Sequence, residues 1–429
     1  MPHRIVIVGG GAGGLVLATR LGNRLGRDGR AEVTLVDPDL IHIWKPLLHE
    51  IAAGTLNSFD DSVSYLSHAK AHGFRFVQGM MNGLDRQAKE VVLAPLEDVD
   101  GRRVVGERRL GYDTLVLAVG SVSNDFGVPG VQEHCVFLDD QKEAERLHER
   151  ILLDALNAPR SREGAPVLSI AIVGAGATGV ELAAELHKAT RQLAAYGPSH
   201  IDPERDVRFT LLEAAPRVLP ALPERLSELT REELERLGIE VLVDERVEEA
   251  TAEGIRTASR FVPARIRVWC AGIQAPRFLR ELGLETGRGG QVVVDQTLRS
   301  VTDSAIFALG DCASCPQPGS DRPVPPRAQA AHQQAMTLER TLTGLLDGGE
   351  PVPFTYKDYG SLVSLSYGAV GSLMGNLFGR VMLEGRLARA AYVSLYRKHQ
   401  MALHGVGWLV LATVARLFAR GTRPRLKLH

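Results

Sequence analysis

The sequence contains few cysteines and no long hydrophobic run. Four cysteines among 429 residues are too few for a disulfide framework, and they fit a reducing compartment. No window approaches the ~20 apolar residues that a membrane-spanning helix requires. An apolar strand at Arg4–Val8 is not preceded by a charged region and a cleavage site, so we expect no secretory signal.

The sequence also carries little net charge, although its charges are unevenly distributed. The formal net charge of −1 excludes a protein that binds polyanions over its whole surface. Residues 380–429 contain ten Lys or Arg and one acid, whereas residues 1–379 contain 40 basic and 50 acidic groups. A short apolar run begins at Trp408 and precedes Arg416 and Arg420. This pattern predicts a segment that lies in a membrane interface and meets anionic lipid, and it disfavours binding of nucleic acid.

One internal repeat organises the chain, whose length suggests two or three domains. RIVIVGGGAGGLVLATRL (Arg4–Leu21) and SIAIVGAGATGVELAAEL (Ser169–Leu186) each combine an apolar strand, glycines and a helical apolar stripe. Each is followed by a strand that ends in an acid, Asp37 or Glu213. Two such βαβ units predict an α/β fold with two parallel sheets of the Rossmann type. We also expect strands at 112–119, 240–243, 265–270 and 291–294, an exposed hairpin or loop at 98–109, a connector at 157–165 and a loop at 312–326.

The first glycine motif predicts a dinucleotide site. Gly9, Gly11 and Gly14 form G-x-G-x-x-G, which permits a tight turn, close approach of a pyrophosphate and close packing of helix on strand. The N-terminus of the following helix favours phosphate. Asp37 stands where a carboxylate accepts hydrogen bonds from ribose hydroxyls.

The second motif repeats this arrangement with Gly174, Gly176, Gly179 and the distal acid Glu213. A carboxylate at that position repels a 2′-phosphate, so NADH is expected to be preferred to NADPH. Arg217 either softens this preference or is a solvated loop charge. Only the sequence context distinguishes such turns from ordinary glycine-rich loops.

Two further features remain open from the residues alone. Glu181 is either an acid favoured by the first turns of a helix or a group beside a redox centre. Cys312 and Cys315 form C-x-x-C, but a zinc site would need two more ligands and no second pair exists. We therefore expect all four cysteines to be non-catalytic and expect no metal.

The chain resembles a known flavoprotein family. IFALGDCA (Ile306–Ala313) is similar to the second FAD motif of flavoproteins with two dinucleotide-binding domains, and YDTLVLAVGS (Tyr112–Ser121) is similar to their returning strand. Other stretches resemble the type II, non-proton-pumping NADH:quinone oxidoreductases, almost from end to end. They are WKPLLHEIAAG (Trp44–Gly54), VWCAGIQAP (Val268–Pro276), PPRAQAAHQQA (Pro325–Ala335), FTYKDYGSL (Phe354–Leu362) and SLYRKHQMALHG (Ser394–Gly405).

The resemblance implies that NADH and a membrane quinone are converted to NAD and quinol through non-covalent FAD. It places Glu181 at the contact of nicotinamide and flavin, with Lys45 as its partner, and both as catalytic residues. It implies FAD contacts at Gly9, Gly11, Gly14, Asp37, Lys45, Pro46, Met81, Gly120, Gly310, Asp311, Ala328 and Gln329. It implies NADH contacts at Gly174, Gly176, Gly179, Glu181, Glu213, Ala271 and Gly272, and a quinone site at Gln329 and Gln333, on one face of a helix that starts near Arg327.

The expected domains are an FAD domain at 1–140 and 286–347, an NADH domain at 141–285, and a C-terminal membrane-associating helical region at 348–429. We expect a peripheral protein on the cytoplasmic face of the inner membrane; whether it forms a homodimer stays open. Two alternatives share the fold. A sulfide:quinone reductase needs cysteines beside the flavin, where Cys135 is the candidate, and a soluble NADH-dependent reductase of a carrier protein needs no basic tail.

Overall fold

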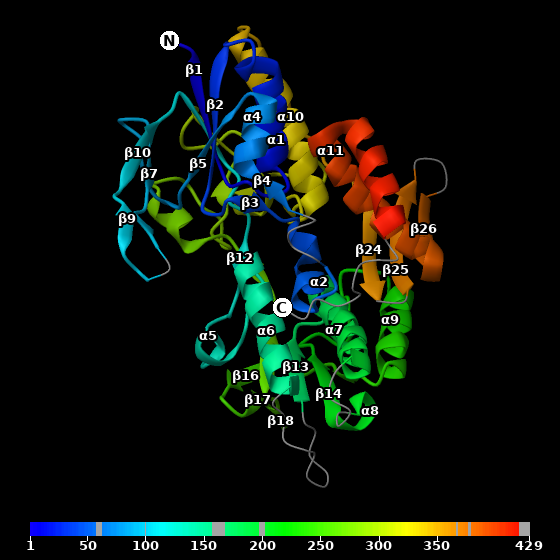
Figure 1. Ribbon diagram of the computed structural model, residues 1–429. Helices are drawn as coiled ribbons and strands as arrows, with labels where there is room; N and C mark the ends of the chain where they lie inside the picture. Colours follow the sequence, from blue (N-terminus) through cyan, green and yellow to red (C-terminus); the bar gives the residue numbers. More distant parts are fainter. Residues whose placement is uncertain are drawn as a thin grey trace. The chain divides into compact units, whose positions relative to one another are not determined.

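The computed structural model describes the chain except for residues 57–61, 99, 157–167, 197–201, 366–367, 376–378 and 420–429. The chain divides into two compact units. Unit 1 comprises Met1–Trp44, Ser62–Val122 and Gln274–Lys357, and unit 2 comprises Lys45–Asp61, Ser123–Ile273 and Asp358–His429. The expected connector at 157–165 lies outside the described residues. Each unit contains one of the two parallel sheets that the repeat predicts, so the α/β fold is confirmed (Figure 1).

Unit 1 is built on a five-stranded parallel sheet with the order β22-β11-β1-β2-β5. Its described strands are β1 (His3–Val8), β2 (Ala31–Asp37), β3 (Ile41–His42), β4 (Val63–Ser64), β5 (Arg75–Gln78), β6 (Met81–Asp85), β7 (Glu90–Leu93), β8 (Leu96–Glu97), β9 (Arg103–Val105), β10 (Arg108–Gly111), β11 (Thr114–Leu117), β21 (Val292–Val293), β22 (Ile306–Ala308) and β23 (Ala313–Ser314). Its described helices are α1 (Gly14–Leu21), η1 (Gly22–Gly26), α4 (Tyr65–His72), η3 (Arg277–Glu281), η4 (Gly310–Cys312) and α10 (Ala328–Leu346).

The central strand β1 explains why the sheet forms. Ile5 to Val8 are all at most 3% exposed, which is the pattern of a parallel strand covered on both faces. Helix α1 packs against α10, and Arg24 of η1, the helical turn that follows α1, forms an ion pair with the buried Glu339 of α10 at 2.8 Å. These contacts join the first and last segments of unit 1. The expected hairpin at 98–109 is present as β8 paired with β9.

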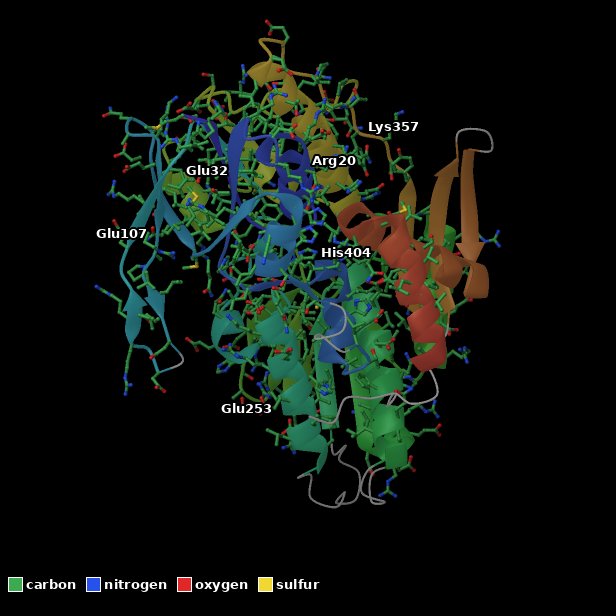
Figure 2. The ribbon with its side chains drawn as sticks, turned by 45° about the horizontal axis from the view of Figure 1, so that its top comes forward. Arg20, Glu32, Glu107, Glu253, Lys357 and His404 are labelled. Carbon is green, nitrogen blue, oxygen red and sulfur yellow. The ribbon has the colours of Figure 1, made fainter. Side chains whose placement is uncertain are left out.

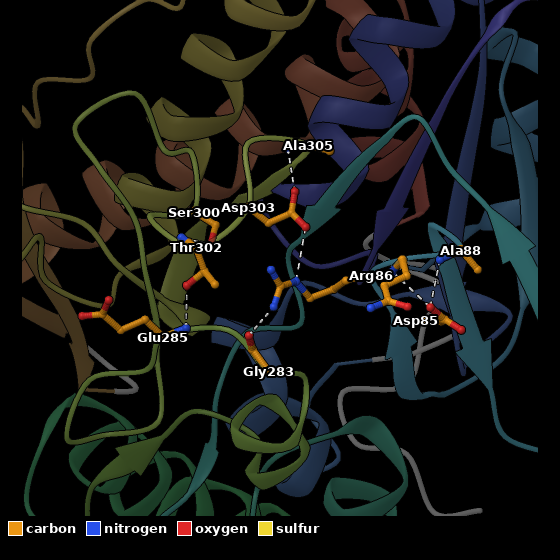
Figure 3. Close-up of polar contacts among 10 residues, drawn as sticks. Asp85, Arg86, Ala88, Gly283, Glu285, Ser300, Thr302, Asp303 and Ala305 are labelled. Carbon is orange, nitrogen blue, oxygen red and sulfur yellow. Dashed lines mark hydrogen bonds and ion pairs between the residues drawn. The ribbon is translucent and has the colours of Figure 1, made fainter.

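A polar network fixes the β6–β7 hairpin within unit 1 (Figure 3). The Arg86 guanidinium contacts Asp303 Oδ2 at 3.2 Å and donates to the carbonyl oxygen of Gly283 at 2.7 Å. Asp303 in turn accepts a hydrogen bond from the backbone N–H of Ala305 at 3.0 Å. Arg86 therefore links the hairpin to the segment that leads into β22.

Unit 2 is built on a four-stranded parallel sheet with the order β15-β14-β13-β19. Its described strands are β13 (Leu168–Val173), β14 (Val207–Leu212), β15 (Glu240–Leu242), β16 (Val247–Ala250), β17 (Gly254–Thr257), β18 (Phe261–Pro263), β19 (Ile266–Trp269), β24 (Gly360–Leu365), β25 (Gly368–Gly375) and β26 (Gly379–Glu384). Its described helices are η2 (Lys45–Leu47), α2 (Leu48–Ala52), α5 (Val131–His134), α6 (Gln141–Leu156), α7 (Ala177–Tyr196), α8 (Pro203–Asp206), α9 (Glu224–Arg236) and α11 (Gly385–Ala419). The chain changes units at β12 (Val122–Ser123) and β20 (Ile273–Gln274).

The C-terminal region contains the expected helical segment, α11, and also a sheet that we did not expect. It begins with an antiparallel sheet, β24-β25-β26, on which α11 packs. Glycines interrupt the strand-like alternation of this stretch, which is why the sequence pattern did not reveal the sheet. Helix α11 is broken at Gly405, whose φ of 81° and ψ of 172° are not helical. None of the helices in the described ranges is both long and apolar enough to cross a membrane.

Candidate active site

The first glycine turn connects β1 to α1 and leaves open space at its centre. A Cβ on Gly9 would collide with the backbone of Ala118, and one on Gly14 would collide with the carbonyl oxygen of Gly9, whereas one on Gly11 would meet nothing within 4 Å. Gly9 also has a φ of 104°, which favours glycine. The turn is thus tight on the protein side and open on the side where a pyrophosphate approaches.

Three side chains hold this turn in place. Asp37 accepts hydrogen bonds from the N–H groups of Gly10, at 2.6 Å, and Asp39, at 3.0 Å. Tyr65 Oη donates to the Gly10 carbonyl oxygen at 2.9 Å, and His42 Nδ1 lies at the same distance from that oxygen. Burial raises the pKa of Asp37 to about 6. Asp37 therefore both shapes the turn and presents a carboxylate at the end of β2.

A second loop of unit 1 ends beside this sheet. Ser121 Oγ donates to Asp311 Oδ2 at 2.8 Å, and the Gly310 N–H donates to Gln334 Oε1 at 2.7 Å. Gly310 and Gly120 have positive φ values of 72° and 70°. A Cβ on Gly120 would meet nothing within 4 Å, so the backbone there also borders open space. Together with the glycine turn, this loop provides the donors and acceptors that the expected FAD site requires.

Helix α10 begins where the sequence predicts, with Arg327 as its N-cap. Ala328 and Gln329 lie in its first turn, and Ala330 is buried beneath them. Lys357, which Figure 2 labels, lies in the segment after α10. Both ends of the Gln333 amide group bind its main chain: Nε2 donates to the Lys357 carbonyl oxygen at 2.8 Å, and Oε1 accepts from the Lys357 N–H at 3.0 Å. Gln333 therefore positions the segment that follows α10.

The second glycine turn, in unit 2, repeats the geometry of the first. A Cβ on Gly174 would lie 2.7 Å from Ala271 Cα, one on Gly179 would collide with the Gly174 carbonyl oxygen, and one on Gly176 would meet nothing within 4 Å. Glu213 accepts hydrogen bonds from the N–H groups of Ala175, at 2.7 Å, and Ala215, at 2.9 Å.

Arg217 is not the solvated loop charge that we considered. Its guanidinium donates to the carbonyl oxygens of Leu222 and Pro220, each at 2.9 Å. The side chain is therefore engaged with its own loop.

Glu181 is buried in unit 2, in the first turns of α7. Its side chain is 9% exposed, its Oε1 accepts a hydrogen bond from the Ser364 N–H of β24 at 2.9 Å, and its Oε2 lies 3.8 Å from His49 Nδ1 of α2. Burial raises the pKa of Glu181 to about 8, against the Ser364 hydrogen bond, which lowers it. The carboxylates of Glu50 and Glu185 raise it further.

The groups around Glu181 are also held neutral by burial. Burial lowers the pKa of His49 to about 4, and burial together with the neighbouring Glu181 raises the pKa of Tyr392, on α11, above its ordinary value. Glu185 is the exception, because its ion pair with Lys188, at 2.6 Å, outweighs burial and lowers its pKa. At neutral pH, Glu181 therefore holds a proton next to a neutral imidazole.

Lys45 lies beside another acid than the one we expected. Its Nζ lies 3.7 Å from Asp139 Oδ1, and its side chain is 48% exposed, whereas the carboxyl group of Glu181 is buried. An exposed ammonium would lose its hydration if it moved beside a buried carboxyl group. Asp139 also accepts hydrogen bonds from the N–H and Oγ of Ser123. The pairing of Lys45 with Glu181 stays a prediction.

The four cysteines are free thiols, and burial raises the pKa of each. The pKa of Cys135 and of Cys312 rises to about 11, and that of Cys270 and of Cys315 rises to about 12. Such thiols stay protonated and are poor nucleophiles. This chemistry disfavours the sulfide:quinone alternative, which needs reactive cysteines.

Several polar residues of these sites were not identified from the sequence. His49, Ser121 and Gln334 lie within stretches that carry the family resemblance, so their position was a usable signal. His42, Tyr65, Ser364 and Tyr392 carried no local signal, because chain folding alone brings them to their partners.

Comparisons with known proteins agree with this geometry. A sequence profile described as pyridine nucleotide-disulphide oxidoreductase matches residues 3–335. A type II NADH:quinone oxidoreductase from Haemophilus influenzae is 44% identical over 444 residues, which cover 99% of each chain. One from Staphylococcus aureus is 30% identical over 379 residues, which cover 87% of this chain and 90% of the relative.

The solved structures agree at the level of the fold. The structure of NDH2 from Plasmodium falciparum in complex with NADH matches with a TM-score of 0.83 at 18% identity, over the full length of both chains. The sequence profile, the two relatives and the paired glycine turns thus lead to one conclusion: this chain belongs to the pyridine nucleotide-disulphide oxidoreductase family and, within it, to the type II NADH:quinone oxidoreductases.

Proposed function

We propose that the chain oxidises NADH and reduces a quinone, with FAD as its resident cofactor. The observation that carries this proposal is the pair of matching glycine turns, one in each unit, each open at its central glycine and each held by a distal acid. FAD, when bound, accepts a hydride from NADH and passes two electrons on. The reaction balances as NADH, one proton and quinone giving NAD and quinol.

In unit 1, Gly11 and Asp37 would hold the pyrophosphate and ribose of FAD, and Asp311 would hold its ribityl chain. The support is the open backbone at Gly11 and the Asp311 carboxylate, which Ser121 orients. The remaining FAD contacts that the resemblance implies stay part of this proposal: Gly9, Gly14, Lys45, Pro46, Met81, Gly120, Gly310, Ala328 and Gln329.

In unit 2, Gly176 would receive the pyrophosphate of NADH, and Glu213 would bind its adenosine ribose. Ala271 and Gly272 lie in the loop that follows β19, and a Cβ on Gly174 would lie 2.7 Å from Ala271 Cα. Glu181 would hold the proton that the reaction consumes. Since its Oε1 accepts the Ser364 N–H, the proton belongs on Oε2, the oxygen that faces His49.

The proposed quinone site uses Gln329 and Gln333 in different ways. Gln333 would act indirectly, because both ends of its amide group bind the backbone of Lys357 and so fix that segment. Gln329, one helical turn earlier on the same face, would face the quinone. An uncharged donor suits a ligand that is apolar apart from two carbonyl oxygens.

A steady-state assay tests the activity against its alternatives. The FAD-loaded protein should oxidise NADH with a short-chain quinone, and it should be inactive with sulfide or with an iron–sulfur carrier protein as the second substrate. Turnover with sulfide and quinone in the absence of NADH would contradict the proposal.

We also propose that the end of α11 lies on an anionic membrane surface, at its cytoplasmic face. After the break at Gly405, four apolar side chains are 45–69% exposed: Val406, Val410, Leu411 and Val414. They recur at helical spacing, so they share one apolar face. The basic residues beyond Ala419 lie outside the described part of the chain, and each would add about 1 kcal/mol near anionic lipid.

Removing residues 405–429 tests the membrane contact. The truncated protein should no longer float with anionic vesicles, and it should still oxidise NADH with a water-soluble acceptor. Salt should weaken binding of the full chain without abolishing it, since the apolar contribution is not screened. Equal flotation of both forms would place the membrane contact elsewhere.

A further inference from the structure

A strained turn of unit 2 presents an aromatic ring to solvent. Phe126 has a φ of 53°, a conformation that is strained for a non-glycine residue, and it is 63% exposed. Two leucines in the described chain share this conformation, Leu219 and Leu298, and both are at most 3% exposed. Their burial offsets the strain, whereas the ring of Phe126 is not buried by the described residues.

Several hydrogen bonds fix the conformation of this turn. The Phe126 N–H donates to Asn124 Oδ1 at 2.9 Å, and the Gly127 N–H donates to Asp125 Oδ1 at 3.0 Å. Gln132 Nε2 donates to the other oxygen of Asp125 at 2.7 Å. These hydrogen bonds fix the backbone from which the ring projects.

The same turn is fastened to the end of β19. Trp269 Nε1 donates to the Asn124 carbonyl oxygen at 2.8 Å, and the Asn124 N–H donates to the Gly272 carbonyl oxygen at 3.3 Å. A Cβ on Gly272 would overlap the ring of Phe126. The ring therefore lies directly against the backbone of Gly272, where only glycine leaves room for it.

This location is the ligand-binding edge of the unit 2 sheet. Ligands of open parallel sheets bind at the carboxyl ends of the strands, and β13 and β19 are neighbours there. In the proposed NADH site, Glu213 at the end of β14 binds the adenosine ribose, and the turn at Gly176 receives the pyrophosphate. The other half of the dinucleotide must then pass over the end of β19, where Gly272 and Phe126 lie.

We propose that Phe126 is a stacking platform for the nicotinamide half of NADH. Binding would cover a rigid aromatic face that is now exposed, and stacking of a base on an aromatic side chain strengthens binding. The turn already holds the ring in position in the free protein. Less conformational entropy is therefore lost when NADH binds. The inference rests on the proposed NADH site in unit 2.

The test is the Kd for NADH, measured by calorimetry with the FAD-loaded, full-length protein under anaerobic conditions, with a non-reducing NADH analogue as a second probe. Phe126→Ala should raise the Kd about tenfold, and Phe126→Tyr should keep it within about twofold. Phe261→Ala is the matched control, because Phe261 is a 39% exposed phenylalanine of the same unit, on β18, that lies under Arg256. It should leave the Kd unchanged.

Phe126→Gly separates stacking from a structural role. Glycine adopts a positive φ without strain, so this variant should be at least as heat-stable as the wild type and should still lose about tenfold in NADH affinity. An unchanged Kd in both Phe126→Gly and Phe126→Ala would overturn the role of Phe126 alone. A wild-type protein that bound FAD and failed to bind NADH would overturn the NADH site itself.

Discussion

The two glycine turns have the same backbone plan and different supports. In both, the central strand of a parallel sheet leads into a helix, and a distal acid accepts an N–H of the turn. In unit 1, the carbonyl oxygen of Gly10 is held by the side chains of His42 and Tyr65. In unit 2, the equivalent oxygen of Ala175 accepts a backbone N–H, that of Leu219, at 2.8 Å.

This difference suits two kinds of ligand. Tyr65 is buried, and a Cβ on Gly10 would collide with its ring, so the first turn is packed from behind by an aromatic residue of α4. Such packing fits a cofactor that stays bound through many turnovers. At the Ala175 carbonyl oxygen, the second turn is instead held by a main-chain N–H from the loop that follows β14, as fits a substrate that enters and leaves in every cycle.

The largest effects are expected from substitutions that distort one glycine turn at a time. Gly14→Val and Gly179→Val would each drive a side chain into the carbonyl oxygen of the first glycine of its own turn. Gly14→Val should abolish FAD binding, seen as loss of visible flavin absorbance. Gly179→Val should retain FAD and weaken NADH binding by at least 100-fold, because each turn belongs to a separate unit.

Loss of FAD from both variants would show that the two turns are not independent. Circular dichroism provides the control, since both variants should keep their helical content.

A second test compares Glu181 and Glu185, two acids of unit 2 whose contributions to the stability of the protein change in opposite directions with pH. The folded-state pKa of Glu181 is about 8 against an ordinary value of 4.5. Its contribution to stability is therefore complete below its ordinary pKa and is lost as pH rises to about 8. Glu181→Gln should remove this slope from the pH dependence of Tm. It should also slow the bleaching of flavin by NADH about tenfold, with FAD still bound.

Glu185→Gln is the matched control for Glu181→Gln, one turn later on α7. The pKa of Glu185 is lowered, so its contribution is present above its ordinary pKa and is lost as pH falls. This variant should reduce Tm at neutral pH and leave flavin bleaching within about twofold. The same pH profile for both variants would contradict the assignment of the buried proton to Glu181.

The sequence predicts the glycines and distal acids of the two nucleotide-binding turns well. It predicts poorly which side chains hydrogen-bond to those turns. The glycines, Asp37 and Glu213 follow from local spacing, because a tight turn and a ribose acid impose fixed positions along the chain. The partners of Gly10 do not, since Tyr65 reaches it across 55 residues. Asp139 was likewise not identified as a neighbour of Lys45, because only chain folding brings the two side chains together.

The choice of nucleotide is a smaller effect that depends on the second turn alone. Glu213→Gln should narrow the preference for NADH over NADPH in kcat/KM about tenfold, because it removes a negative charge that faces the 2′-phosphate. Flavin content should not change. Comparable kcat/KM values for both nucleotides in the wild type would contradict the role of Glu213.

The smallest expected effect comes from a single hydroxyl group, that of Tyr65, which supports the first turn and has no counterpart among the described supports of the second. Tyr65→Phe removes one hydrogen bond to the Gly10 carbonyl oxygen and keeps the packing of the ring, so it should cost about 1 kcal/mol and raise the Kd for FAD several-fold. NADH affinity should not change.

Tyr112→Phe is the control, because the Tyr112 hydroxyl is buried without a hydrogen-bond partner in the described chain, and removing it should leave stability equal or higher. Equal effects of the two substitutions on FAD retention, measured by ultrafiltration, would show that side-chain support of the first turn does not matter.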